Sequence, residues 1–197
     1  MRYAAMWPRY AAWWDKMVIT ASRVHEFERA AAKIIAGKPR YAEVEAATGM
    51  PWYAVGLIHL REGNCNFGTY LGNGQSLNHV TTIVPRGRGP FRGANPFLDG
   101  AIDALKIDGL TSVKDWRLEK ILFWEEVFNG SGYTDRGLPS PYLFGGTSVQ
   151  QPGKYVADHV FVPRVWDTQP GVAPVLATLA RLDPSIKFVR ETTEIVA

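Results

Sequence analysis

The sequence predicts a mainly helical protein with one small insertion that is not helical. Apolar residues recur at steps of three and four along several stretches, which is the period of an amphipathic helix. Residues 66–98, by contrast, are rich in glycine, asparagine and proline. With 46% hydrophobic and 21% charged residues, the chain has the composition of an ordinary globular protein. We therefore expect a mainly α fold in a single domain that spans residues 1–197.

A long amphipathic helix is predicted within the N-terminal residues 1–38. Its apolar positions lie three or four residues apart between Tyr10 and Ala36, and Gly37-Lys38-Pro39 is expected to end it. These positions are Trp13, Trp14, Met17, Ala21, Val24, Phe27, Ala31 and Ile34.

Two further helices are predicted before the insertion. The first is short, at residues 41–47, and Thr48-Gly49-Met50 interrupts the pattern after it. The second covers residues 51–62, because Pro51 suits the first helical position, where its missing N–H is not needed.

Residues 66–98 are expected to form a small β-lobe or structured loop, with one strand at residues 80–84, where β-branched side chains follow one another. Helical periodicity returns at residues 98–106, 116–128 and 171–181. The helix at 116–128 carries apolar residues on nearly every side, which predicts a buried central helix.

One carboxylate stands out at the end of the helix at 51–62. Glu62 follows Ala54 and Ile58 at steps of four, so it shares a face with core residues. Burial and the negative end of the helix dipole both raise the pKa of such a group, which suits a general acid. Gly63 fits the left-handed residue that ends many helices. The competing interpretation is that Glu62 is an ordinary surface residue at a frayed helix end.

Cysteine and histidine indicate no metal or redox chemistry. Cys65 is the only cysteine, so an internal disulfide and a thiolate zinc site are excluded, and no base is identifiable for it as a nucleophile. His59 and the other histidines form no His-Glu-x-x-His pattern. We expect no metal and no cofactor.

The charge balance is mild, with a net charge of +3. No apolar run approaches the ~20 residues of a membrane span, and the N-terminal residues lack the apolar core of a secretory signal. The loop at 85–96 gathers Arg86, Arg88 and Arg92, which either touch an anionic surface or are simply solvated. Nucleic-acid binding is not favoured, because no recognised module is present.

Short motifs occur in a fixed order over residues 39–180. They are ATGMPWY (47–53), IHLRE (58–62), TYLGNG (69–74), VPRGR (84–88), AIDAL (101–105), FNGSGY (128–133), SPYL (140–143) and GKYV (153–156). Together they resemble a family of bacteriophage and prophage lysozyme-like endolysins.

This resemblance implies a lysozyme-like helical fold in which Glu62 is the acid that cleaves peptidoglycan. Asn129-Gly130 also looks like the Tyr-Asn-Ala-Gly signature of goose-type lysozymes and lytic transglycosylases, which lines the sugar cleft. The chain departs from these patterns at Phe128, where the signature has tyrosine, and at Gln75-Ser76, where Asp-Pro is expected.

Two more residues are candidates for catalysis beside Glu62, because a glycosidase usually employs two carboxyl groups or a held water. Thr81 falls where related lysins keep a threonine that faces the acid. Glu126 matches the glutamate that the family carries before its Asn-Gly. Each also has a structural interpretation, Thr81 as a strand residue and Glu126 as a buried carboxylate bonded to the backbone or to Thr81.

The substrate-binding candidates come from the polar, motif-bearing loops. Tyr70, Tyr133 and Tyr142 are predicted to stack on sugar faces. Asn73 and Asn129 are predicted to pair with N-acetyl and hydroxyl groups, because an amide both donates and accepts hydrogen bonds.

The leading hypothesis is a monomeric, muramidase-type endolysin that acts on peptidoglycan. It would remain in the host cytoplasm until lysis, when it reaches the cell wall without a signal peptide. A lytic transglycosylase stays open, since the substrate's own 6-hydroxyl can replace water. The alternatives are a chitinase or another hexosamine-glycan hydrolase, and a non-catalytic wall-binding protein.

Overall fold

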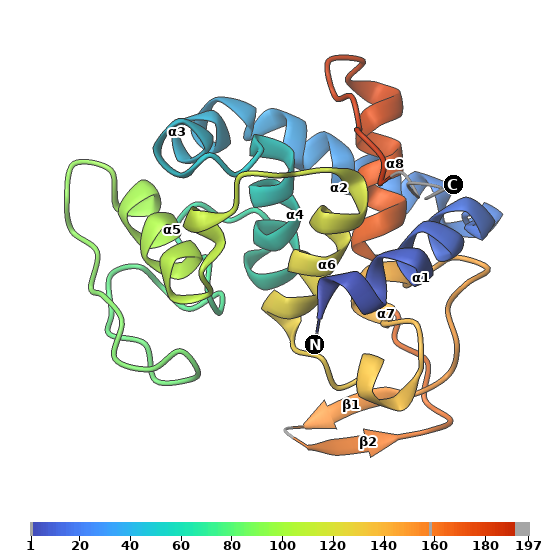
Figure 1. The fold of residues 1–197 in the computed structure, drawn as a ribbon. Coiled ribbons are helices and arrows are strands. Elements are labelled where there is room, and N and C mark those ends of the chain that lie inside the picture. Colours follow the sequence, from blue (N-terminus) through green and yellow to red (C-terminus); the bar gives the residue numbers. More distant parts are fainter. Residues whose placement is uncertain (1, 158, 192–197) are drawn as a thin grey trace. The chain divides into compact units, whose positions relative to one another are not determined.

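The computed structural model describes residues 2–157 and 159–191, and this part of the chain is mainly helical, as predicted (Figure 1). The α-helices within it are α1 (Tyr3–Lys16), α2 (Val24–Ala36), α3 (Lys38–Thr48), α4 (Trp52–Gly63), α5 (Pro96–Ile107), α6 (Leu118–Asn129), α7 (Pro141–Phe144) and α8 (Val172–Leu182). Strands β1 (Lys154–Ala157) and β2 (Val160–Val162) pair antiparallel. None of the described helices is both long and apolar enough to cross a membrane.

The chain divides into two compact units. The first unit combines Met1–Ala31 with Arg117–Ala197, and the second unit is Ala32–Trp116. Helix α2 runs from the one into the other. Each unit encloses apolar side chains of its own, such as Phe144 in the first and Leu105 in the second, both without solvent exposure.

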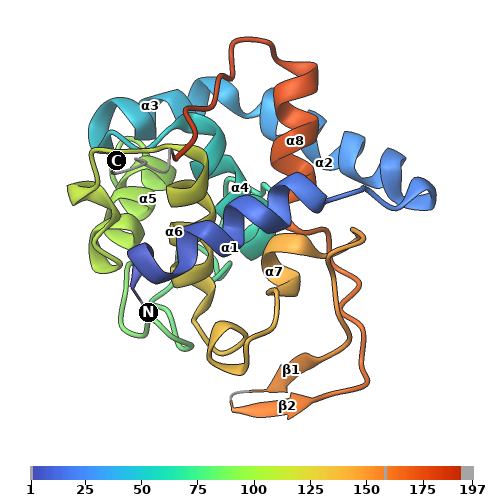
Figure 2. The same ribbon diagram turned by 45° about the vertical axis from the view of Figure 1, so that its right-hand side comes forward.

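In the first unit α6 is the buried central helix that the sequence predicts. Seven of its residues are buried, and α1, α7 and α8 pack against it (Figure 2). Tyr3 of α1 meets Phe123 of α6 edge to face, with ring centroids 5.5 Å apart. One face of the helix, with Lys120, Trp124, Val127 and Phe128, is only half-buried, so the apolar residues extend beyond its buried faces.

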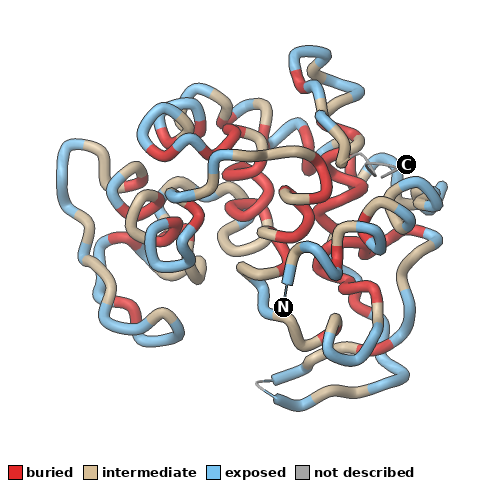
Figure 3. The backbone as a smooth tube through the Cα atoms, in the orientation of Figure 1, coloured by how far each residue is buried: buried red, intermediate tan, exposed pale blue. Residues whose placement is uncertain are grey.

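In the second unit α3 packs against α4 and α5. Helix α4 is buried along most of its length, whereas the loop after it is largely exposed (Figure 3). Tyr41 of α3, Phe67 of the loop and Phe97 of α5 form an aromatic cluster, with centroids between 4.7 and 6.1 Å apart. This cluster ties the loop to the helices.

The prediction of one long N-terminal helix is wrong, because the chain leaves the helix at residues 17–23 and forms α1 and α2 instead. Val18-Ile19-Thr20 is β-branched and favours extended backbone. Its backbone bonds to a distant loop: Thr20 N donates to Gly146 O at 3.1 Å, and Ser148 N donates to Val18 O at 2.9 Å. Because these partners lie far away in the sequence, they leave no trace in the apolar period from which one continuous helix was predicted.

The predicted strand at 80–84 is also absent; these residues are irregular loop. Thr81 N donates to Arg88 O at 2.9 Å, which bends the segment back on itself rather than pairing it with a second strand. The strands that do form, β1 and β2, lie in a turn-rich stretch to which the sequence analysis assigned no strand.

Candidate active site

Glu62 lies in the last turn of α4 on the face predicted for it. Ala54 and Ile58, which precede it at steps of four, have no exposed surface. The helix starts one residue later than predicted, at Trp52, with Pro51 as the preceding cap residue. Glu62 itself is half-buried, so its side chain stands where the core meets the surface.

The end of α4 differs from the prediction by one residue. Gly63 is still helical, and the left-handed residues are Asn64, with φ 50°, and Cys65, with φ 59°. Gly63 leaves room for the loop that follows, because a Cβ there would lie 2.3 Å from the Thr69 hydroxyl oxygen. The loop therefore packs directly against the last turn of the helix.

A tight turn at residues 72–74 rests on the backbone of Glu62. Gly74 has φ +71°, and a Cβ on it would lie 2.1 Å from the Glu62 carbonyl oxygen. Tyr70 N donates to Gln75 O at 2.7 Å, and Leu77 N donates to Gly68 O at 3.0 Å. Only glycine fits this approach, so the turn fixes where Glu62 stands.

Burial raises the pKa of Glu62 to about 7, and the nearby charge of Arg61 reduces this shift only in part. At neutral pH a substantial fraction of the carboxyl groups therefore carries a proton. A protonated carboxylic acid at a half-buried position is what general acid catalysis of glycosidic bond cleavage needs.

His59, one turn before Glu62, has a structural role. Its Nε2–H donates to the Asn66 carbonyl at 3.0 Å, so its Nδ1 accepts from the Tyr41 hydroxyl at 2.9 Å. Burial lowers the pKa of His59 to about 4, which keeps the ring neutral. The side chain thus fastens the start of the loop to α4.

Cys65, which follows α4, is half-buried. Burial raises the pKa of its thiol, although a hydrogen bond with Tyr41 opposes this. The thiol therefore stays protonated near neutral pH.

Thr81 is buried and its hydroxyl is occupied within the loop. The hydroxyl donates to Pro85 O at 2.6 Å and accepts from Arg88 N at 3.0 Å. Its one proton is therefore not directed at a water. The structural interpretation of Thr81 fits these contacts, though as a loop residue and not as a strand residue.

The side chains of Asn73 and Gln75 are also occupied by hydrogen bonds within the loop. Asn73 donates to the carbonyls of Ile83 and Val84 at 3.2 and 3.4 Å. The side-chain oxygen of Gln75 accepts from the backbone N–H groups of Thr82 and Ile83 at 2.7 and 3.2 Å. Gln75, where Asp-Pro was expected, therefore holds the loop tip instead of a water.

Tyr70 offers no sugar platform as it lies. The residue has no exposed surface, and its ring stacks on Phe91 with centroids 5.3 Å apart. Its hydroxyl donates to Asp103 at 2.8 Å, and Arg88 pairs with the same carboxylate. Burial acts to raise the pKa of Asp103, but hydrogen bonds from Arg88 outweigh burial and hold this pKa below its usual range.

The remaining candidates belong to the first unit, where Glu126 is fully buried on α6. It accepts hydrogen bonds from the hydroxyls of Tyr10, at 2.6 Å, and Thr134. Burial raises its pKa despite these two bonds. Glu126 is thus a buried, hydrogen-bonded carboxylate, but the expected partners are wrong: the side chains of Tyr10 and Thr134 bond to it, not the backbone or Thr81.

Asn129 is the exposed candidate of the first unit. It is the last residue of α6, and Gly130 after it has φ +100°. Tyr133 and Tyr142 are 6% and 3% exposed, and the Tyr133 hydroxyl accepts from Tyr155 N at 3.1 Å. These two rings, as they lie, offer no face to a sugar.

Comparison of this chain with protein-family models, curated proteins and solved structures gave no match. Among residues 2–157 and 159–191, no cluster of three or more histidine, cysteine, aspartate or glutamate side chains is arranged to hold a metal ion.

Proposed function

We propose that this protein is a peptidoglycan-degrading endolysin that cleaves the glycan strand, with Glu62 as the general acid. The observation that carries the proposal is the carboxyl group of Glu62, half-buried at the end of a core helix, with its pKa raised to about 7. The ordered motifs around it, which resemble lysozyme-like endolysins, support the choice of substrate.

The role of Glu62 in this proposal is to give its proton to the glycosidic oxygen as the bond to the anomeric carbon breaks. The leaving sugar then departs as a neutral alcohol, and positive charge develops on the sugar ring that remains. After cleavage Glu62 is a carboxylate, and it recovers its proton from water or from the attacking hydroxyl group.

The attacking group distinguishes two forms of the enzyme. Water gives a muramidase product with a reducing end, whereas the substrate's own 6-hydroxyl gives an anhydro product. The hydroxyl of Thr81 and the carboxylate of Glu126 both have internal partners. These contacts favour a mechanism that needs few residues besides Glu62, and an intramolecular 6-hydroxyl meets that condition.

Mass spectrometry of purified peptidoglycan after digestion tests the proposal. Wild type should release muropeptides, Glu62→Gln should release at least a hundredfold less, and Glu43→Gln, which changes an exposed carboxylate of α3, should match wild type. Reducing ends would identify a muramidase, and anhydro ends a lytic transglycosylase.

Other outcomes would contradict the proposal. Equal release by wild type and Glu62→Gln would remove Glu62 from catalysis. Binding to sacculi without any release would favour a wall-binding protein, and cleavage of chitin oligomers alone would favour a chitinase.

A further inference from the structure

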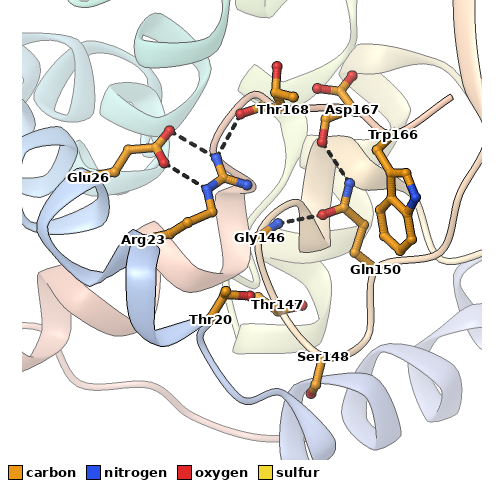
Figure 4. Close-up of a pocket in the computed structure, with 10 residues that line it drawn as sticks. All are labelled: Thr20, Arg23, Glu26, Gly146, Thr147, Ser148, Gln150, Trp166, Asp167 and Thr168. Carbon is orange, nitrogen blue, oxygen red and sulfur yellow. Dashed lines mark hydrogen bonds and ion pairs between the residues drawn. The ribbon is translucent and has the colours of Figure 1, made fainter.

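A pocket of about 660 Å³ lies within the first unit, whereas Glu62 belongs to the second (Figure 4). Three segments line it: residues 20–26 at the start of α2, residues 146–150 after α7, and residues 166–168 before α8. The pocket contains none of the residues that the resemblance to endolysins singled out.

The frame of this pocket is fixed by backbone contacts. Ile19 and Thr147 form an isolated antiparallel bridge, which joins the first two segments. Gly146 has φ +83°, and a Cβ on it would lie 2.6 Å from both Arg23 Nη1 and the Phe27 ring. Only glycine allows the loop to approach α2 so closely.

Polar side chains in the pocket are held in place before any ligand arrives. Gln150 accepts from Gly146 N at 2.7 Å and donates to the Asp167 carbonyl at 2.8 Å (Figure 4). Arg23 donates to the Thr168 carbonyl at 2.7 Å. A fixed amide and a fixed guanidinium reduce the entropy lost when a ligand binds.

The charged groups that line the pocket are all paired. Arg23 contacts both carboxylate oxygens of Glu26, at 2.7 and 2.9 Å. Asp167 pairs with Lys154 at 3.4 Å. Because positive and negative charges balance here, the pocket favours a neutral polar ligand over an anion or a cation.

Trp166 provides a flat apolar surface at the same place. It is 54% exposed, and within the part of the chain that the structure describes no ring or cation contact engages its indole. The exposed residues Thr20 and Thr168 line the same pocket. An open aromatic ring beside fixed hydrogen-bonding groups matches a ligand with one apolar face and a polar edge.

We propose that this pocket binds a neutral pyranose unit of a polysaccharide, with the C–H face of the sugar against the indole of Trp166. A pyranose fits because its C–H groups form an apolar face and its hydroxyls lie around the edge. The site would hold a glycan without cleaving it. It does not depend on the assignment of Glu62, because its residues all belong to the other unit.

NMR of the full chain with the disaccharide di-N-acetylchitobiose tests this site. The indole N–H signals report on the seven tryptophans separately, and Trp166→Phe identifies the signal of Trp166. The disaccharide should shift this signal in a saturable way, and raising salt from about 50 to 500 mM should leave the affinity within twofold, since no charge is recognised.

Variants complete the test. Calorimetric titration with the same disaccharide measures the variants, because it does not depend on the Trp166 signal. Trp166→Ala should weaken binding at least tenfold, whereas Trp7→Ala, which changes a half-buried tryptophan of α1 outside the pocket, should leave it unchanged. The remaining indole signals report whether each variant is folded. Undiminished binding by folded Trp166→Ala would overturn the proposal. So would a Trp166 signal that responds to inorganic phosphate or to an acidic peptide but not to the disaccharide.

Discussion

Burial favours the neutral form of two side chains, one turn apart, at the end of α4. It raises the pKa of the Glu62 carboxyl to about 7 and lowers the pKa of the His59 ring to about 4. Neutral His59 anchors the loop through Tyr41 and Asn66, and protonated Glu62 is left as the proton donor of the pair.

The pKa of Glu62 predicts how stability depends on pH. Its folded value, about 7, lies above the ordinary 4.5, so the folded state binds the proton more tightly and stability falls as pH rises from about 4.5 to 7. At pH 8 Glu62→Gln should stabilise the fold by about 1–3 kcal/mol, or roughly 2–12 °C in Tm, and at pH 4 by almost nothing. Thermal unfolding at the two pH values measures this.

The exposed carboxylate of Glu43 supplies the matched control for stability. Glu43→Gln should change Tm by less than about 1 °C at either pH, because a surface charge contributes little and glutamine keeps an oxygen that can accept the hydrogen bond from Asn95. An equal Tm for Glu62→Gln and wild type at pH 8 would show that Glu62 is not desolvated.

Two variants of Thr81 test whether its hydroxyl stabilises the loop. Thr81→Val removes a donor to Pro85 and an acceptor for Arg88, and should destabilise the protein by about 1–3 kcal/mol in chemical denaturation. Thr81→Ser keeps both bonds and should stay within about 1 kcal/mol. A large loss of stability in Thr81→Ser would mean that the methyl group, not the hydroxyl, matters.

Glu62 could be predicted from the sequence because its environment is mostly local. Ala54 and Ile58 lie on the same helix face, so a step of four was enough. Tyr70 and Tyr142 could not be judged in this way, since a polar loop in the sequence says nothing about which distant rings enclose a side chain. Trp166 was missed, because no motif surrounds it and only its exposure reveals it.

At the scale of elements, the turn at residues 72–74 controls the position of the last turn of α4. Gly74→Ala would place a Cβ 2.1 Å from the Glu62 carbonyl and would strain a positive φ. It should destabilise the protein by about 2–4 kcal/mol, whereas Gly87→Ala, with φ +74° and nothing within 4 Å, should cost only about 1 kcal/mol. Denaturant unfolding compares the two variants.

The difference between these two glycine variants is the informative quantity. Because both positions have positive φ, the backbone strain cancels and the close approach to Glu62 remains. Equal destabilisation by Gly74→Ala and Gly87→Ala would show that the turn does not rest on α4.

The helices that could be predicted are those whose apolar period is not broken by hydrogen bonds to distant parts of the chain. Helices α4, α5, α6 and α8 begin and end within a few residues of the expected bounds. The break before α2 was missed because the apolar period persists through it; the β-branched run Val18-Ile19-Thr20 was a local sign, and bonds to the distant loop at Gly146 hold the backbone there. The same holds at Thr81, whose partner Arg88 closes a loop where a strand was expected.

At the scale of the whole molecule, the three arginines of the loop at 85–96 differ in how far they are exposed and paired. In the loop at 85–96, Arg88 is half-buried and pairs with Asp103, whereas Arg86 and Arg92 are exposed. The exposed pair is therefore the part of this loop that can meet an anionic cell envelope.

Charge reversal tests this role. Arg86→Glu with Arg92→Glu should weaken binding to purified cell walls at least threefold at about 20 mM salt, and the effect should vanish near 0.5 M, where charges are screened. Arg29→Glu, which changes an exposed arginine outside this loop on α2, serves as the control. Equal binding by wild type and the double variant at low salt would remove the loop from wall contact.

The pH dependence of peptidoglycan cleavage tests the central claim most directly. If protonated Glu62 is the general acid, kcat/KM should be level below about pH 6 and should fall about tenfold per pH unit above an apparent pKa of about 7. Glu62→Gln should lose the activity at every pH. Cleavage by wild type that stays constant to pH 9, or the same fall in a Glu62→Gln variant that remains active, would contradict the account.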